Sequence, residues 1–71
     1  MTPQLLPNRF LRLPAVMECT GLKRSTIYAM VGVGNFPPPV PLGARSVGWI
    51  AAEVEDWCAD RIAKRPARTL Q

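Results

Sequence analysis

The chain has 71 residues, with nine Lys and Arg, five Asp and Glu, and no His, so its formal net charge is +4. This length suits one small domain and leaves no room for a deep catalytic pocket between two lobes. The absence of His excludes Ser-His-Asp and Cys-His catalysis and every His-containing zinc site, and two cysteines cannot form a four-thiolate site. The positive charge favours an anionic partner, with nucleic acid first and an acidic protein or membrane surface second.

The N-terminal residues lack the apolar core of a secretion signal, and the longest apolar stretch, residues 27–34, is far shorter than the ~20 residues that span a membrane. We therefore expect a soluble cytoplasmic protein whose residues 1–8 form a flexible N-terminus. Cys19 and Cys58 can form one disulfide, but their apolar neighbours favour two small buried side chains in a reducing cytosol.

The first predicted element is a short helix over residues 14–19. Pro14 suits the first turn of a helix, where its missing N–H costs nothing, and the helix is expected to bury Ala15, Val16 and Cys19. A turn over residues 20–22 follows, because Gly21 readily adopts the left-handed conformation that ends many helices.

A second helix is predicted over residues 24–31, with Ile27, Met30 and Val31 facing inward. Glycines then end it, and the prolines of residues 37–41 impose an extended segment. This composition favours a stiff spacer over a proline-recognition ligand. A β-hairpin over residues 40–50 comes next, with its turn at residues 43–46.

The last predicted element is a helix over residues 51–64, stopped by Pro66 and followed by a basic tail over residues 66–71. Its acids lie near its start and its bases near its end, which complements the helix dipole. Apolar residues recur at spacings of three and four: Ala51, Val54, Trp57, Cys58 and Ile62. We expect the carboxylates of Glu53, Asp56 and Asp60 to form a solvated face rather than a catalytic pair.

Two short helices joined by a glycine-containing turn are typical of a helix-turn-helix motif. In the second helix Ser25 and Ala29 point outward, and Thr26 and Tyr28 flank them. Lys23 and Arg24 lie at its N-terminal end, where free N–H groups favour phosphate. Such a surface suits the major groove of DNA, since hydroxyls bond to bases or phosphates and a small alanine permits close approach. The alternative is an ordinary amphipathic helix with a polar outer face.

Three aromatic residues each allow a nucleic-acid contact or a packing role. Trp49 and Trp57 can stack on bases, but a chain this small needs them in its core, so packing is the stronger interpretation. For Tyr28, a hydroxyl contact with phosphate and simple packing beside the hairpin are equally supported.

Five segments in a fixed order resemble the AlpA-type family of small phage, prophage and integrative-element regulators. They are R-L-P-A-V at 12–16, T-G-L-K-R-S-T-I-Y at 20–28, F-P-P-P-V at 36–40, V-G-W at 47–49 and E-V-E-D-W at 53–57. The resemblance implies a mainly α fold with a small β-hairpin, namely a winged helix-turn-helix domain over residues 9–65. It also implies that residues 24–30 form the recognition helix, and that the hairpin is a wing with Arg45 and Ser46 at its tip on DNA.

The resemblance further implies a non-enzymatic protein, without cofactor or metal, that binds double-stranded DNA. Family members act as transcriptional regulators or as recombination directionality factors that steer an integrase toward excision. We favour the second role, with an integrase as partner and head-to-tail copies assembling on DNA. This chain departs from the family where Lys23 replaces a capping Ser, where V-G-V-G ends the recognition helix, and where Ala29 replaces a longer polar residue.

A different class of function remains open from the residues alone. The basic surface, the P-x-x-P pattern and the C-terminal tail can serve a protein-interaction module that binds an acidic partner. RNA binding has less support, because no aromatic side chains are arranged for base stacking.

Overall fold

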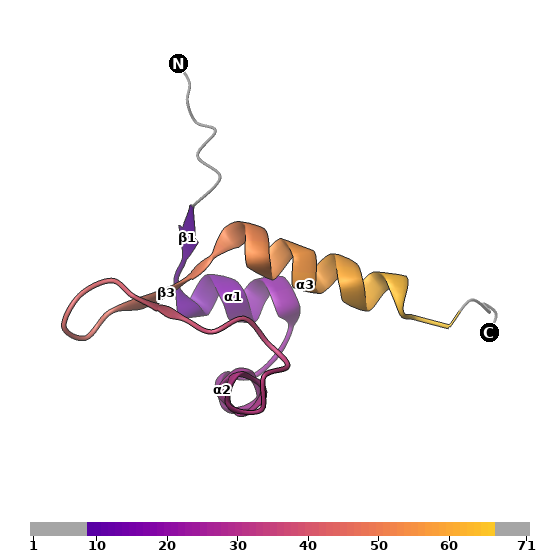
Figure 1. Cartoon of the computed structure of the whole chain (residues 1–71), viewed down its shortest axis with the longest axis horizontal. Coiled ribbons are helices and arrows are strands. Elements are labelled where there is room, and N and C mark those ends of the chain that lie inside the picture. Colours follow the sequence, from indigo (N-terminus) through magenta and orange to yellow (C-terminus); the bar gives the residue numbers. More distant parts are fainter. Residues whose placement is uncertain (1–8, 67–71) are drawn as a thin grey trace, which may run out of the picture.

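The computed structural model describes residues 9–66. The predicted N-terminal segment, residues 1–8, and all of the predicted basic tail beyond Pro66 lie outside the described residues. The described part contains three helices, α1 (Leu13–Thr20), α2 (Arg24–Gly32) and α3 (Ala51–Ala63). It also contains three strands, β1 (Phe10–Leu11), β2 (Val40–Pro41) and β3 (Val47–Ile50) (Figure 1). The predicted mainly α, winged helix-turn-helix fold is confirmed, with helix ends within one residue of those expected.

The first helix buries a different face from the one predicted. Val16 is buried in the core, whereas Ala15 and Cys19 are exposed. The half-buried partners of Val16 in α1 are Leu13, Met17 and Thr20. These positions follow the spacing of three and four residues that keeps side chains on one helix face. The prediction of buried Ala15 and Cys19 was therefore wrong, because the stripe begins one residue before Pro14, at Leu13.

The turn between α1 and α2 depends on Gly21, as predicted. Gly21 has φ 74°, in the left-handed region, and its N–H donates to the Met17 carbonyl at 2.7 Å. The Thr20 hydroxyl donates to the Val16 carbonyl at 2.8 Å and accepts from the Leu22 N–H at 3.2 Å. These contacts close the end of α1 and set the direction in which α2 departs.

Replacing Gly21 with alanine is expected to destabilise the fold by about 1 kcal/mol, because an L side chain is strained at this φ. No atom lies within 4 Å of the position of the new Cβ, so the loss measures backbone strain alone. Gly32→Ala at the end of α2 is the matched control, since Gly32 has the same open space without a positive φ. Urea denaturation of both variants tests this, and equal unfolding midpoints would contradict it.

The sheet has the strand order β1-β3-β2 and is antiparallel throughout. The predicted hairpin is present: Val40 pairs with Gly48 and Pro41 with Val47. The sequence did not indicate β1, which pairs with the other edge of β3 through Leu11 opposite Trp49. Two residues are too few to show the alternating pattern of a strand. Because β1 leads directly into α1, this pairing attaches the start of the helix-turn-helix motif to the wing.

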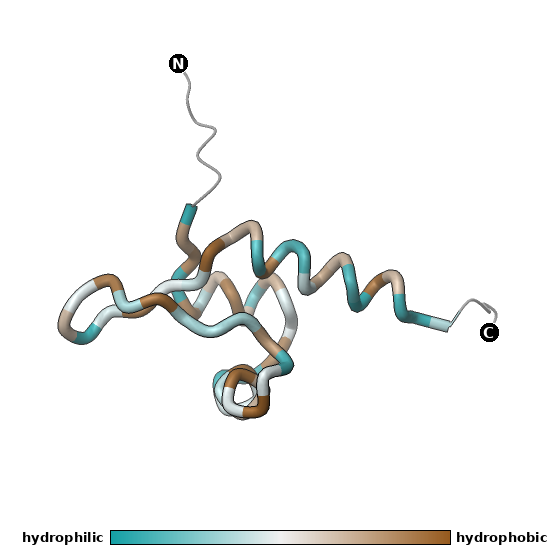
Figure 2. The backbone as a smooth tube through the Cα atoms, viewed as in Figure 1, coloured by the Kyte–Doolittle hydropathy of each residue, from teal (hydrophilic) through white to brown (hydrophobic). Residues whose placement is uncertain are grey.

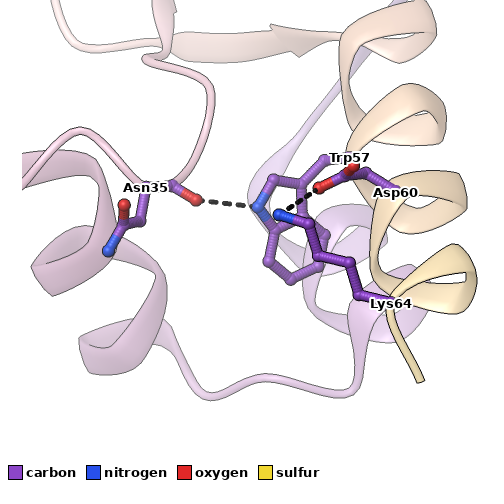
Figure 3. A network of polar contacts seen from close by, with 4 residues as sticks. All are labelled: Asn35, Trp57, Asp60 and Lys64. Carbon is purple, nitrogen blue, oxygen red and sulfur yellow. Dashed lines mark hydrogen bonds and ion pairs between the residues drawn. The ribbon is translucent and has the colours of Figure 1, made fainter. Parts of the chain in front are cut away.

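The core is a cluster of five buried side chains, one or more from each helix, from β3 and from the segment before β2: Val16, Ile27, Phe36, Trp49 and Val54. Trp49 is fully buried, and its indole N–H donates to the Pro37 carbonyl at 2.9 Å. Trp57 is half-buried and donates to the Asn35 carbonyl at 2.7 Å (Figure 3). Both tryptophans therefore fix the segment that joins α2 to the wing, and the prediction that they pack rather than present open stacking faces is confirmed.

The third helix contacts the core through residues 51–58 and not through its last turn. Ala51 and Val54 are buried and Trp57 and Cys58 are half-buried, but Ile62 is 60% exposed. The predicted apolar stripe therefore continues beyond the body of the domain, where α3 projects from it (Figure 1). Hydrophilic and hydrophobic residues alternate along its whole length in Figure 2. Its end carries an exposed ion pair between Lys64 and Asp60 at 3.2 Å (Figure 3).

Candidate nucleic-acid interface

The outward face of α2 is built as the sequence predicted. Ile27 is fully buried, and Met30 and Val31 are half-buried against the core. The opposite side therefore exposes Ser25 and Ala29. These side chains are short, so a rod-shaped ligand can approach the backbone of α2 closely.

The N-terminal end of α2 combines two cations with an uncapped helix start. Lys23 occupies the capping position in an extended conformation, and no side chain accepts from the first turn. Arg24 follows as the first helical residue, and both side chains are exposed. Neither is held in a salt bridge with another residue of the described range 9–66. The positive end of the helix dipole and two cations thus act in the same direction, which favours an anion at this end.

Tyr28 is both packed and accessible. Its ring meets the buried Trp49 ring edge-on, with centroids 6.0 Å apart and planes at 62°. The side chain is nevertheless 41% exposed. Thr26, the other predicted flanking residue, is half-buried. The structure thus gives Tyr28 the packing role and leaves an exposed part of the side chain free for contact, so the two interpretations are compatible.

The wing presents Arg45 at its tip. The chain bends over residues 43–45, and the Ser46 carbonyl accepts from the N–H groups of Leu42 and Gly43 at 2.7 and 3.3 Å. Arg45 is exposed, while Ser46 is half-buried at the root of the tip. Trp49 of β3 connects the wing to α2, because its ring packs against the Tyr28 ring. Its indole N–H also donates to the Pro37 carbonyl in the segment between α2 and the wing. The predicted contact residues of α2 and those of the wing therefore lie on elements that pack against the same residue, Trp49.

Arg12 is a basic residue that the predicted site does not include. It immediately precedes α1, and its Nε donates to the Val47 carbonyl, 35 residues away, at 3.1 Å. This bond ties the start of α1 to the strand that leaves the wing. The only sequence signal was its place in the R-L-P segment, which does not reveal a contact with β3.

Acidic side chains are concentrated away from this face. Four of the five acids of the chain lie on α3, all exposed: Glu53, Glu55, Asp56 and Asp60. In Figure 1, α3 lies on the far side of α1 from α2. The start of α2 and the wing tip thus carry Lys23, Arg24 and Arg45 without an acid, whereas the carboxylates lie on α3, whose end also carries Arg61 and Lys64. Such a separation orients the molecule toward a polyanion.

The cysteines differ from the predicted buried pair. Both are free thiols; Cys19 is exposed and Cys58 is half-buried. Burial raises the pKa of the Cys58 thiol, and the neighbouring Cys19 and Glu55 raise it further. The prediction that both side chains are buried was wrong, because the apolar stripe of α1 runs through Leu13, Val16 and Met17 and leaves Cys19 exposed beside the half-buried Cys58.

Residues 9–66 contain neither a metal-binding group of side chains nor a membrane-spanning helix. No group of three or more His, Cys, Asp or Glu side chains there is placed to hold a metal ion. None of the helices in that range has both the length and the apolar character needed to cross a membrane.

Comparison with known proteins identifies the family of the chain. Residues 9–62 match the family described as "Prophage CP4-57 regulatory protein (AlpA)". The chain is 51% identical over 63 residues to "Uncharacterized protein ORF88" of Enterobacteria phage P4, covering 89% of this chain and 72% of the relative. It is 44% identical over 59 residues to "DNA-binding transcriptional activator AlpA" of Escherichia coli strain K12, covering 75% of this chain and 84% of the relative. The matched region contains α1, α2, the wing and nearly all of α3, and the chain belongs to the AlpA family of prophage regulatory proteins.

Proposed function

We propose that this protein binds double-stranded DNA sequence-specifically, with α2 in the major groove and the wing on the adjacent backbone or minor groove. The observation that carries the proposal is the exposed face of α2, with Lys23 and Arg24 at its N-terminal end. Ser25, Thr26 and Ala29 would meet base edges. Tyr28, Arg45 and Ser46 would contact the backbone. The relative in E. coli is named as DNA-binding, which supports the same conclusion.

The biological role that we infer is that of a recombination directionality factor, which changes the shape of the DNA and is not an enzyme. A single module of this size covers about 600–1,000 Å² of its surface on DNA, which limits affinity and selectivity. Several copies on adjacent sites, arranged head to tail, would increase occupancy and bend the DNA toward a form that an integrase can excise. The protein would then act in the cytoplasm of a bacterial host.

Transcriptional regulation is the second candidate role, and the name of the E. coli relative favours it directly. Both roles use the same DNA-binding face, so only the target sites separate them. Excision of a reporter element by a co-expressed phage integrase, with and without this protein, tests the first role. A reporter fused to the nearest promoter tests the second. Activity in the promoter assay alone would exclude the directionality role.

DNA binding itself is tested by the affinity for a mixed-sequence duplex across a salt series. If Lys23, Arg24 and Arg45 each neutralise one phosphate, these three contacts together contribute about 2.7 to the fall of log K per log unit of salt, at ~0.9 per phosphate. Arg24→Ala should lower the affinity and reduce this slope by about 0.9. Absence of binding at low salt, or binding indifferent to Arg24, would favour a protein-interaction module. In that case removal of residues 66–71 should abolish function instead.

A further inference from the structure

Arg12 is held in a fixed place at the junction between the helix-turn-helix motif and the wing. Its backbone is extended at the capping position of α1, with φ −86° and ψ 167°. Its carbonyl accepts from the Val16 N–H at 3.0 Å, and its Nε donates to the Val47 carbonyl at 3.1 Å. The backbone of Arg12 is therefore tied to the first turn of α1, and its side chain is tied through Nε to the start of β3.

The rest of the guanidinium is free to bind. An arginine has five N–H donors, and the bond to Val47 uses only the one on Nε. Within residues 9–66, the two Nη groups make no hydrogen bond or ion pair with another side chain or carbonyl. Arg12 is exposed, so these four donors face solvent in the planar fork that matches the oxygens of a phosphate.

The position of Arg12 fits the path of a DNA strand. In a winged helix-turn-helix complex, the recognition helix occupies one groove, and the first helix crosses the backbone. The DNA backbone that separates this groove from the neighbouring groove beside the wing must pass between α2 and the wing. Helix α1 packs against both α2 and β3, and Arg12 stands at its start on the β3 side. An exposed guanidinium at this place lies where the backbone of that DNA strand would pass, rather than on the outward face of α2 that would meet base edges.

We infer that Arg12 binds a DNA backbone phosphate through its Nη groups, while its bond to the Val47 carbonyl holds the guanidinium in place. This inference rests on the DNA binding proposed above. A side chain already fixed by the fold loses little conformational freedom on binding, so its contact is stronger than that of a free surface lysine. The competing role is a structural brace between α1 and the wing without any contact to DNA.

The test is a salt series with a mixed-sequence duplex for the wild type, Arg12→Gln, Arg12→Lys and the control Lys64→Gln. Lys64 lies at the end of α3 and is paired with Asp60. Arg12→Gln should weaken binding at low salt about tenfold and reduce the salt slope by ~0.9. Arg12→Lys keeps the charge, so its slope should match the wild type while its affinity falls about threefold. Lys64→Gln should change neither quantity.

The outcomes separate the two roles of Arg12 and the two proposals. An Arg12→Gln slope equal to the wild-type slope, with a lower melting temperature, would assign Arg12 to bracing alone and overturn the inference. A wild type without salt-dependent binding would instead overturn the proposed function.

A second experiment uses the wild-type protein, so it gives an answer even if the Arg12 variants do not fold. Phenylglyoxal labels exposed guanidinium groups, and mass spectrometry locates the label. DNA should protect Arg12 and leave Arg65 on the far end of the chain reactive. Labelling of Arg12 at the same rate with and without DNA would contradict the phosphate contact.

Discussion

Replacement of Trp49 by alanine is expected to unfold most of the protein at 37 °C. Trp49 is fully buried, bonds the Pro37 carbonyl and supports the Tyr28 ring. Truncation of a buried tryptophan costs about 3–5 kcal/mol, because it removes apolar burial and leaves a cavity. At ~0.05–0.15 kcal/mol per residue, a domain of this length has a total stability of roughly 4–10 kcal/mol. The loss is therefore comparable with the whole stability.

Thermal unfolding followed by circular dichroism measures this effect, with Trp57→Ala as the control. Trp57 has the same kind of indole-to-carbonyl bond but is only half-buried, so its truncation should cost clearly less. A Trp49→Ala variant that melts within a few degrees of the wild type would show that the core is not organised around this residue.

Ala29→Glu is expected to weaken DNA binding about 100-fold while leaving the fold intact. Ala29 is exposed in the middle of the outward face of α2, and glutamate is a good helix former. The new carboxylate would stand among phosphates in the proposed complex, and like charges brought together cost several kcal/mol. Fluorescence anisotropy with a labelled duplex measures the loss.

The matched control is Ala59→Glu, the same change at an exposed position of α3. Because α3 already carries four acids, one more should reduce affinity only through the small change in net charge. Equal losses in the two variants would show that α2 has no special position on DNA.

Much of this fold could be predicted because short signals agreed with one another. Pro14, Gly21 and the prolines after Phe36 mark element ends that hold whatever the tertiary packing is. The inward set of Ile27, Met30 and Val31 in α2 was confirmed because it spans enough of the helix to fix its orientation. The outward residues of the candidate site followed from that orientation.

What the sequence could not show depends on contacts between distant segments. The strand β1 exists only through its pairing with β3, and Arg12 gains its fixed position only from the Val47 carbonyl. In α1, six predicted residues fit two overlapping stripes, and the packing of Leu13 and Met17 chose the one that leaves Cys19 outside. The exposure of Ile62 has a similar cause, since the apolar stripe of α3 continues where the core has ended.

The central claim is that α2 and the wing together form the surface that binds DNA. An NMR titration of the isotopically labelled protein with a short duplex tests it most directly, because every backbone amide reports its own surroundings. The account predicts the largest shifts at residues 23–29, at residues 43–47 and at Arg12, with the exposed face of α3 unchanged. Shifts concentrated on α3, or spread evenly over the chain, would contradict it.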